Sequence, residues 1–358
     1  MKRKLMYIAN VRLPTEKAHG LAIMKMCEAF AREGLEVELI VPKRFNSARE
    51  DPYQYYGVER LFKITKLFCI DLIGLWAEPG FVIQTMTFTL SVLLYGPWSK
   101  AEIIYGRDDF SLALLSIFKR NTVWEAHTAK RGLLVKLLLI KSKMIVVISK
   151  GLKGYFISLG VNESKVLVSP SGVDLIQFDI KENKEEIRKR LSLPLDKKII
   201  AYIGKYTTMG RDKGVEELKK AFPSVRETYP QAHLLIVTEA LPPEVPLYMK
   251  ASDILVMNYP NTEHYARYMS PLKLFEYMAS GRPIIAPRLQ SILEIVDEDS
   301  AYLFTPEDQK NLVDTINIVL SDLSEAHKRA LKALEKVREY SWRKKANKII
   351  RTLSWDNI

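Results

Sequence analysis

The chain has 358 residues, of which 47% are hydrophobic and 27% charged, and it carries a net charge of +12. This composition excludes a disordered or fibrous protein, and the length allows two domains of ordinary size. Only two cysteines are present, Cys27 and Cys69, which excludes a disulfide framework and a cysteine-based zinc site and favours a reducing, cytoplasmic location.

The positive charge is concentrated in the first half of the chain. Residues 1–180 carry 25 basic and 17 acidic groups, a difference of +8, and the remainder carries 29 and 25, a difference of +4. Such an excess suits phosphate-bearing ligands or an anionic membrane surface. Nucleic acid is not an expected partner, because no nucleic-acid-binding motif is present and most basic residues are interspersed with acids.

The first part of the chain alternates between strand and helix patterns. Residues 5–10 predict a strand, a loop ends near Gly20, residues 21–33 predict a helix closed by Gly34, and residues 35–41 predict the next strand. The basic start lacks a long apolar segment, so we expect a first strand and not a signal peptide. Further buried strands are expected at 101–105, 121–126 and 144–148.

Two segments raise the question of a membrane. Residues 79–99 carry no charge but are interrupted by glycine and proline, so we expect a buried helix rather than a membrane span. Residues 129–143 combine an apolar core with five basic residues. They fit a basic helix lying on an anionic surface, and equally a packed helix whose lysines reach water.

A second strand and helix series begins near residue 197. Strands are expected at 197–204, 231–240, 252–260 and 282–287, with a glycine-containing polar loop to Gly214 and a helix at 215–222. Two α/β domains with a boundary between 170 and 196 fit best, and the cleft between them is the expected ligand site. The basic stretch 340–355 predicts a terminal helix.

The run SPLKLFEYMASGRP at 270–283 predicts a helix with both ends marked. Ser270 suits the N-cap, Pro271 the first helical position and Gly281 the residue after the end. Lys273 is anomalous, because exposed N–H groups and the helix dipole favour an anion in a first turn. Either a bound anion compensates Lys273, as at phosphate-binding helix starts, or its side chain extends into water.

Three segments in order resemble the family 4 (group 1) glycosyltransferases of the GT-B architecture. They are GVNESKVLVSPSGVDLIQF at 160–178, IGKYTTMGRDKGVEEL at 203–218, and SPLKLFEYMASGRPIIA at 270–286. The resemblance implies two Rossmann-like doubly wound domains facing across a cleft. It places an acceptor domain at 1–170, joined by the C-terminal helix 343–358, and a nucleotide-sugar domain at 171–342.

The resemblance also implies roles for individual residues of the second domain. Glu276 matches the acid that holds the nucleotide ribose, although it could instead pair with Lys273. Lys205 and Lys213 match the cations that neutralise the leaving diphosphate, with Arg211 in the same loop as a substitute for one of them. The backbone N–H groups of Ser270, Leu272 and Lys273 are expected to face the diphosphate. A solvated basic loop is the alternative for the lysines.

In the first domain the resemblance points to three positions. Gly20 matches a glycine that approaches the donor phosphates, and it could equally be a simple turn glycine. His127 matches a histidine near the reaction centre. Arg107 and Asp108 either face the cleft or pair with each other. The chain departs from the family at Tyr268, where an acid that contacts the donor sugar is usual, and Glu263 and His264 lie nearby but out of register.

The implied function is transfer of a sugar from a UDP- or GDP-sugar to a glycan, lipid-linked or small-molecule acceptor. Retention at the anomeric carbon, no metal site and no required cofactor are expected, at the cytoplasmic side of a membrane. The alternatives are a nucleotide-sugar 2-epimerase and a non-catalytic nucleotide-sugar-binding subunit. A dinucleotide-dependent oxidoreductase is disfavoured, because no G-x-G-x-x-G follows the first strand.

Overall fold

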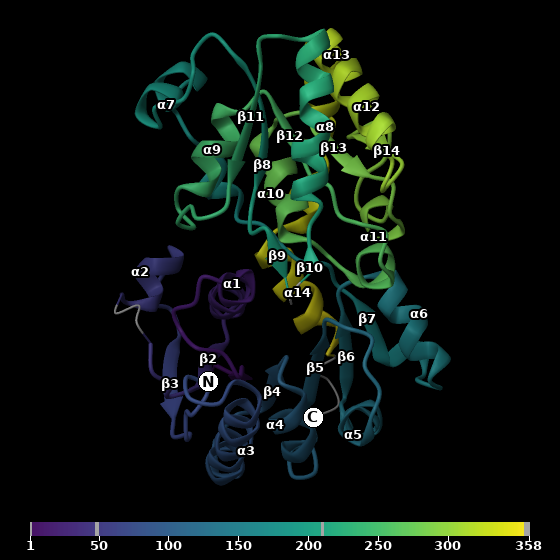
Figure 1. Ribbon diagram of the computed structural model, residues 1–358. Coiled ribbons are helices and arrows are strands. Elements are labelled where there is room, and N and C mark those ends of the chain that lie inside the picture. Colours follow the sequence, from purple (N-terminus) through teal and green to yellow (C-terminus); the bar gives the residue numbers. More distant parts are fainter. Residues whose placement is uncertain (1, 47–49, 209–210, 354–358) are drawn as a thin grey trace. The chain divides into compact units, whose positions relative to one another are not determined.

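A computed structural model describes residues 2–46, 50–208 and 211–353, without the side chains of residues 208 and 211. The chain divides into two compact units (Figure 1). Unit 1 comprises Met1–Pro170 and Trp342–Ile358, and unit 2 comprises Ser171–Ser341.

Unit 1 is built on a seven-stranded parallel sheet with the order β3-β2-β1-β4-β5-β6-β7. Its strands are β1 Lys4–Ile8, β2 Glu36–Pro42, β3 Lys63–Leu67, β4 Ile103–Gly106, β5 Thr122–Ala126, β6 Met144–Val147 and β7 Val166–Val168. Its helices are α1 Ala18–Arg32, α2 Pro52–Tyr56, α3 Ala77–Tyr95, α4 Asp109–Leu115, α5 Leu133–Lys141, α6 Lys150–Ser158 and α14 Trp342–Thr352. Strands β4, β5 and β6 are buried along their whole length, as expected for a parallel sheet covered on both faces.

Helix α14 closes unit 1 although it lies at the far end of the chain. It packs on α1, and the Arg343 guanidinium pairs with the Glu33 carboxylate at 2.6 Å. The buried Lys345 ammonium donates to Glu125 at 2.8 Å and to the Ser169 carbonyl at 2.9 Å. The last predicted helical residues, 354–358, lie outside the described part of the chain.

Unit 2 contains a five-stranded parallel sheet with the order β11-β8-β12-β13-β14. Its strands are β8 Lys198–Ile203, β11 Ala232–Val237, β12 Ile254–Val256, β13 Ile284–Pro287 and β14 Tyr302–Phe304, with a small hairpin of β9 Thr207–Thr208 and β10 Arg211–Asp212. Its helices are α7 Lys184–Arg190, α8 Val215–Thr228, α9 Val245–Ala251, α10 Leu272–Ser280, α11 Gln290–Leu293, α12 Gln309–Ser321 and α13 Leu323–Lys336. Two apolar clusters form around this sheet, one including Leu274 and Phe275 of α10 and the other including Val215 and Leu218 of α8.

Both sheets are doubly wound, as the sequence patterns predict. In unit 1 the chain adds strands on one side of β1 and then returns to add β4 on the other. In unit 2 the same reversal separates β11 from β12, on opposite sides of β8. Open α/β sheets bind ligands beyond the carboxyl ends of the strands at such a reversal, so each unit has one preferred edge position for a site.

One predicted element differs in its environment. The uncharged helix forms as α3, but it is not the buried core helix that its composition predicts, because only 33% of its most apolar window is buried. By length and composition alone it could cross a membrane, and it is the single such helix among the described residues. The positions of the polar and apolar side chains along the helix decide which of its faces meets the sheet. Composition gives only the totals and therefore does not predict that face.

Candidate ligand site in unit 2

The candidate site lies at the carboxyl ends of β8 and β12, where the strand order of unit 2 reverses. Gly204 follows β8, and Asn258 and Tyr259 lie just beyond β12. The turn between Lys213 and Gly214 leads into α8 and is tied to this edge, because the Asn258 side-chain amide donates to the Gly214 carbonyl at 2.8 Å. The fold therefore brings two loops and the start of α10 to the position where an open α/β sheet binds ligands.

Two glycines are required at this edge. Gly204 has a φ of +134°, and a Cβ there would lie 2.8 Å from the Cε atom of Lys273. Gly214 has a φ of +76°, and a Cβ there would overlap the Asn258 carbonyl oxygen. Both backbone conformations disfavour other residues, so both loops need glycine to approach their neighbours this closely.

Helix α10 begins differently from the expectation. The N-cap position is Pro271, with no side-chain cap, and not Ser270. The Ser270 hydroxyl instead accepts a hydrogen bond from the Ser171 backbone N–H at 2.9 Å, and the Ser171 hydroxyl donates to the Ser270 carbonyl at 2.9 Å. The C-terminal prediction is confirmed, since Gly281 has the left-handed φ of +67°. Leu272 is half-buried in the first turn, where N–H groups lack intrahelical acceptors.

Lys273 is buried, so the expectation of a side chain extending into water is wrong. Its Nζ atom lies 3.3 Å from the centre of the Tyr202 ring and 5.8 Å from that of Tyr259. Within the described part of the chain this ammonium has no hydrogen-bond partner. A cation–π contact compensates only part of the cost of removing an ammonium from water, so an anion bound nearby would stabilise the charged form of Lys273.

The two other lysines named by the sequence differ in exposure. Lys213 is half-buried and Lys205 is exposed. Burial, and then the charge of Lys205, lower the pKa of Lys213. Burial and then Lys213 hold the pKa of Lys273 well below its usual range. Because each cation destabilises the next, a polyanion bound among them would relieve the repulsion.

Glu276 lies one turn beyond Lys273 on α10 and does not form the expected ion pair with it. No ion pair or hydrogen bond joins these two described side chains. Burial raises the pKa of Glu276 to about 7, an effect that Lys273 only partly opposes. A half-buried carboxylate without a cationic partner can accept hydrogen bonds from hydroxyl groups of a ligand.

The Arg211 side chain lies outside the described part of the structure, so its predicted role in the loop stays a prediction. Gly20 lies inside the first turn of α1, where a Cβ would overlap the Tyr56 hydroxyl and the Thr15 methyl group. The reading of Gly20 as a simple turn glycine is therefore wrong, because tight packing inside unit 1 explains it.

His127 belongs to a buried charge network at the carboxyl end of β5. Its Nε2 atom lies 3.2 Å from a Glu125 carboxylate oxygen. The fully buried Glu125 carboxylate also accepts from the Tyr105 hydroxyl at 2.7 Å and pairs with Arg107 at 3.2 Å and with Lys345. Burial first, and then Arg107, lower the pKa of His127 to about 4, so its imidazole is neutral near pH 7.

The expected alternative of an Arg107–Asp108 ion pair is wrong. Arg107 pairs with Glu125, while the Asp108 carboxylate accepts from the Ser111 backbone N–H at 3.1 Å and caps α4. The sequence offered no signal for the Glu125–Lys345 contact, because 220 positions separate the two residues.

The structure adds one pair that sequence reasoning left apart. Tyr268 ends the π-helical turn His264–Tyr268, and its hydroxyl donates to the Glu263 carboxylate at 2.9 Å. Tyr268, where the resemblance implies an acid, therefore holds the acid Glu263. The five-residue spacing carried the signal, since a π-helical turn places residues i and i+5 on one side.

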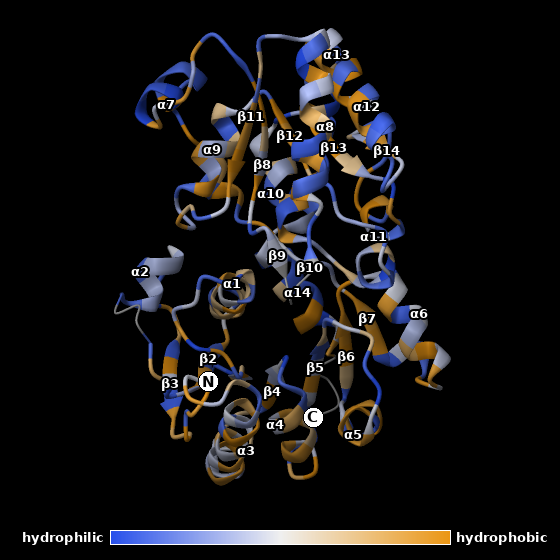
Figure 2. Ribbon diagram, viewed as in Figure 1, coloured by the Kyte–Doolittle hydropathy of each residue, from blue (hydrophilic) through white to orange (hydrophobic). Residues whose placement is uncertain are grey.

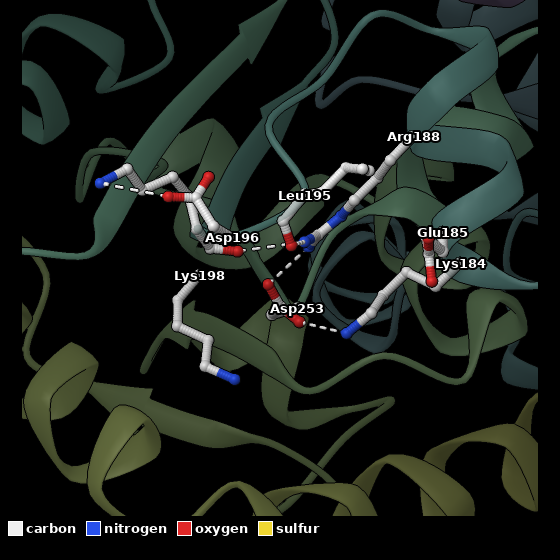
Figure 3. Close-up of a pocket in the computed structure, with 8 residues that line it drawn as sticks. Lys184, Glu185, Arg188, Leu195, Asp196, Lys198 and Asp253 are labelled. Carbon is white, nitrogen blue, oxygen red and sulfur yellow. Dashed lines mark hydrogen bonds and ion pairs between the residues drawn. The ribbon is translucent and has the colours of Figure 1, made fainter.

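A separate pocket of about 470 Å³ opens at the opposite edge of the unit 2 sheet (Figure 3). Lys198 begins β8 there, and Asp253 precedes β12. Asp253 pairs with Lys184 at 2.6 Å and with Arg188 at 2.7 Å, and Figure 3 shows these side chains converging. The Arg188 guanidinium also donates to the Ala251 carbonyl at 2.8 Å. This cluster is internally paired and lies at the amino ends of the strands, so it anchors α7 and is not the candidate site.

No group of three or more His, Cys, Asp or Glu side chains in the described residues could hold a metal ion. The candidate site thus consists of lysines, backbone N–H groups, one carboxylate and aromatic rings. That donor set suits a phosphate-bearing, hydroxyl-bearing ligand.

Comparison with known sequences finds matches to glycosyltransferases. Residues 197–322 match the model of the glycosyl transferases group 1. One relative is the putative teichuronic acid biosynthesis glycosyltransferase TuaC of Bacillus subtilis. It is 30% identical over 165 residues, which make up 42% of this chain and 40% of that protein. D-inositol 3-phosphate glycosyltransferase of Corynebacterium diphtheriae is 24% identical over 221 residues, or 52% and 49% of the two chains. The matches span less than half the length of these relatives.

Solved structures match the whole chain. Sucrose-phosphate synthase from Thermosynechococcus elongatus has a TM-score of 0.78 at 18% identity, with 98% of both chains covered. HepE of Anabaena, solved with UDP-glucose, has a TM-score of 0.75 at 15% identity, covering 98% of this chain and 99% of that one. The chain has the fold of the GT-B glycosyltransferases, as the sequence motifs predict.

Proposed function

We propose that this chain is a group 1 glycosyltransferase that transfers a sugar from a nucleotide-diphospho-sugar to an acceptor, on the basis of the family match at residues 197–322 and of its GT-B fold. The observation that carries the proposal is the Lys273 ammonium, buried at the strand-order reversal of unit 2 without a hydrogen-bond partner in the described residues. A bound diphosphate would supply acceptors for this ammonium, which supports the proposal.

In this proposal unit 2 binds the nucleotide. Lys273 and Lys213 contact the diphosphate, with the exposed Lys205 at the entrance, and the first N–H groups of α10 donate to it. Glu276 accepts hydrogen bonds from the ribose hydroxyls. As the bond from the anomeric carbon to the phosphate breaks, negative charge grows on the leaving diphosphate, and fixed cations stabilise that charge.

Several finer features belong to the same proposal. The donor is a UDP- or GDP-sugar, the sugar is transferred with retention, and no metal takes part. UDP-glucose in the HepE crystal supports the donor class. His127 contributes near the sugar as a neutral imidazole, and the acceptor is a glycan, a lipid-linked sugar or a small molecule. We place the reaction at the cytoplasmic side of a membrane.

Nucleotide binding provides the first test. A thermal-shift series with UDP, GDP, ADP and the corresponding monophosphates should show stabilisation by one diphosphate, about 2.7 kcal/mol at 100 times its dissociation constant. If none of the diphosphates binds, the transferase proposal fails.

Turnover provides the second test. Hydrolysis or transfer with the matching nucleotide-sugar should fall strongly in Lys213→Ala and Glu276→Ala, while Lys332→Ala, an exposed lysine of α13, serves as the control. Unchanged turnover in both site variants would refute the residue assignment. The 2-epimerase and the non-catalytic subunit are not favoured by the family match, and product analysis separates them from a transferase.

A further inference from the structure

Helix α3 of unit 1 has its apolar face turned outward. From residue 81 to residue 95, every exposed side chain of this helix is large and apolar: Phe81, Val82, Met86, Leu90 and Leu94. Val82, Met86, Leu90 and Leu94 are each four residues apart and form one stripe along the helix. No Asp, Glu, Lys, Arg or His lies between Glu78 and Lys100. A surface helix of a globular protein normally shows the reverse distribution.

The polar side chains of α3 face the interior of unit 1. Gln84, Thr85 and Thr89 are buried. The Gln84 amide donates to the Asn10 side chain at 2.9 Å, and the Asn10 amide donates to the Thr85 hydroxyl at 3.1 Å. The Thr89 and Ser111 hydroxyls are 3.1 Å apart and share a hydrogen bond. These bonds fasten α3 to the fold, so the helix cannot leave unit 1 to span a bilayer without breaking them.

Neighbouring elements extend the apolar stripe. Trp76 and Trp98 flank the two ends of α3, and the Trp98 side chain is 87% exposed. Helix α3 packs against α4, and α4 packs against α5. Ile117 and Phe118, just after α4, and Leu133 and Ile140 of α5 are also exposed. Figure 2 shows hydrophobic colouring on α5 and over much of α3. We call this surface of α3, α4 and α5 the apolar face.

Positive charge accompanies the apolar face. Residues 77–143 contain nine basic and five acidic residues, a difference of +4. Of the acids, Asp108 caps α4, Asp109 pairs with Lys130 and Glu125 is buried in the charge network. Lys100, Arg120, Lys136 and Lys141 are exposed. Lys136 and Lys141 belong to α5, and Lys100 and Arg120 lie in the segments that follow α3 and α4, so exposed positive charge accompanies the exposed apolar side chains.

We propose that the apolar face docks onto an anionic lipid bilayer, with α3 lying parallel to the surface and its stripe inserted at the boundary between headgroups and acyl chains. Apolar insertion and attraction of lysines to anionic headgroups act together in such binding. The two tryptophans suit the interfacial region, where their rings are amphipathic. The expectation of a surface helix at 129–143 is thereby extended, with α5 supplying charge and α3 the inserted side chains.

A second copy of this chain fits the face less well. In a twofold dimer the same patch meets itself, so the exposed lysines and arginine would face one another. Like charges placed opposite each other across an interface cost free energy, whereas an anionic lipid surface complements them.

Vesicle flotation tests the proposal on the full chain. Wild-type protein should float with vesicles of equal parts phosphatidylcholine and phosphatidylglycerol, and much less with phosphatidylcholine alone. The double variant Met86→Gln/Leu90→Gln should lose binding about tenfold or more. The matched control is Ile318→Gln/Leu331→Gln, which removes two apolar side chains of unit 2 with similar exposure, 58% and 61%. It should float like the wild type.

The charge component is tested separately. Lys136→Gln/Lys141→Gln should weaken binding about fivefold for each lysine, and added salt should reduce wild-type binding. Circular dichroism and tryptophan fluorescence, which reports unit 1, show that each variant is folded. Nucleotide binding by unit 2 is measured separately, so loss of docking is distinguishable from failure of the proposed function.

Three results would overturn the proposal. The first is wild-type protein that floats with neither vesicle type, and the second is an α3 variant that floats undiminished. The third is a dimer, detected by light scattering, that the α3 variant dissociates while vesicles stay unbound, which would assign the face to protein association.

Discussion

Both units bury a charged side chain near the carboxyl ends of their strands, but the charge is paired in unit 1 and unpaired among the described residues of unit 2. In unit 1 the buried Glu125 carboxylate is surrounded by Arg107, Lys345, His127 and Tyr105. In unit 2 the buried Lys273 side chain lies against aromatic rings, is destabilised as a cation by Lys213 and has no hydrogen-bond acceptor in the described residues. A paired buried charge holds elements together, whereas an unpaired buried cation can be compensated by an anion that binds beside it.

The largest expected effect concerns the satisfied charge. Glu125→Ala leaves Arg107 and Lys345 buried without their acceptor and should reduce the free energy of unfolding by about 3–5 kcal/mol. All five tryptophans lie in unit 1 and none in residues 171–341, so tryptophan fluorescence during urea unfolding reports unit 1 alone. Glu36→Ala, which removes an exposed partner of Lys4, should change stability by no more than about 0.5 kcal/mol. Equal effects of the two variants would contradict the role of the network.

The unsatisfied charge should behave in the opposite way. Lys273→Met removes a buried ammonium, so ligand-free unit 2 should keep or gain stability. Its affinity for the nucleotide diphosphate should fall by about 10- to 100-fold, the value of a hydrogen bond to a charged group. Isothermal titration calorimetry measures the affinity, with Lys332→Met of α13 as the exposed control. A destabilised variant with unchanged affinity would mean that Lys273 is structural.

Glu276 gives a pH-dependent version of the same comparison. Its pKa is raised to about 7, so its stabilising contribution is complete below the ordinary carboxyl pKa and is lost as the pH rises through about 7. Glu276→Gln should therefore be more stable than the wild type near pH 8, by about 1 kcal/mol, and the difference should vanish near pH 4. Differential scanning calorimetry at several pH values measures this. A stability difference that does not change with pH would show that Glu276 is not buried as a carboxylate.

The smallest expected effect is that the His127 imidazole does not titrate near neutral pH. His127 has a pKa lowered to about 4, so its imidazole should stay neutral from pH 8 down to about pH 5. A histidine-selective NMR titration, with His127→Gln to assign the resonance, checks this. Protonation of His127 between pH 6 and 7 would show that Glu125 outweighs burial and Arg107 at this position.

Much of the fold could be predicted from local patterns. The alternation of apolar strands with amphipathic helices identified two doubly wound domains, and the positive φ of Gly281 agrees with its predicted place after a helix. The exact start of α10 could not be predicted, because Ser270 uses its hydroxyl to bind Ser171, which lies 99 positions away. Long-range contacts of this kind compete with local capping, and no local pattern reports them.

In the candidate site, too, local patterns predicted some features and long-range contacts decided the others. Lys273 was anomalous from its position in a first turn, but its burial beneath Gly204 and against Tyr202 follows from the packing of α10 on β8. The Arg107–Glu125 pair replaced the adjacent Arg107–Asp108 pair because side chains at the ends of neighbouring parallel strands meet, while adjacent residues diverge.

The sequence by itself determined the fold class and which lysines and carboxylates are available, because these depend on local periodicity and on motifs within short segments. Tertiary structure alone decided which charges are paired and which are not, and which face of α3 meets solvent. Burial and pairing depend on residues far apart in the chain. The free energy of a buried charge is therefore a property of the folded unit and not of the segment that carries it.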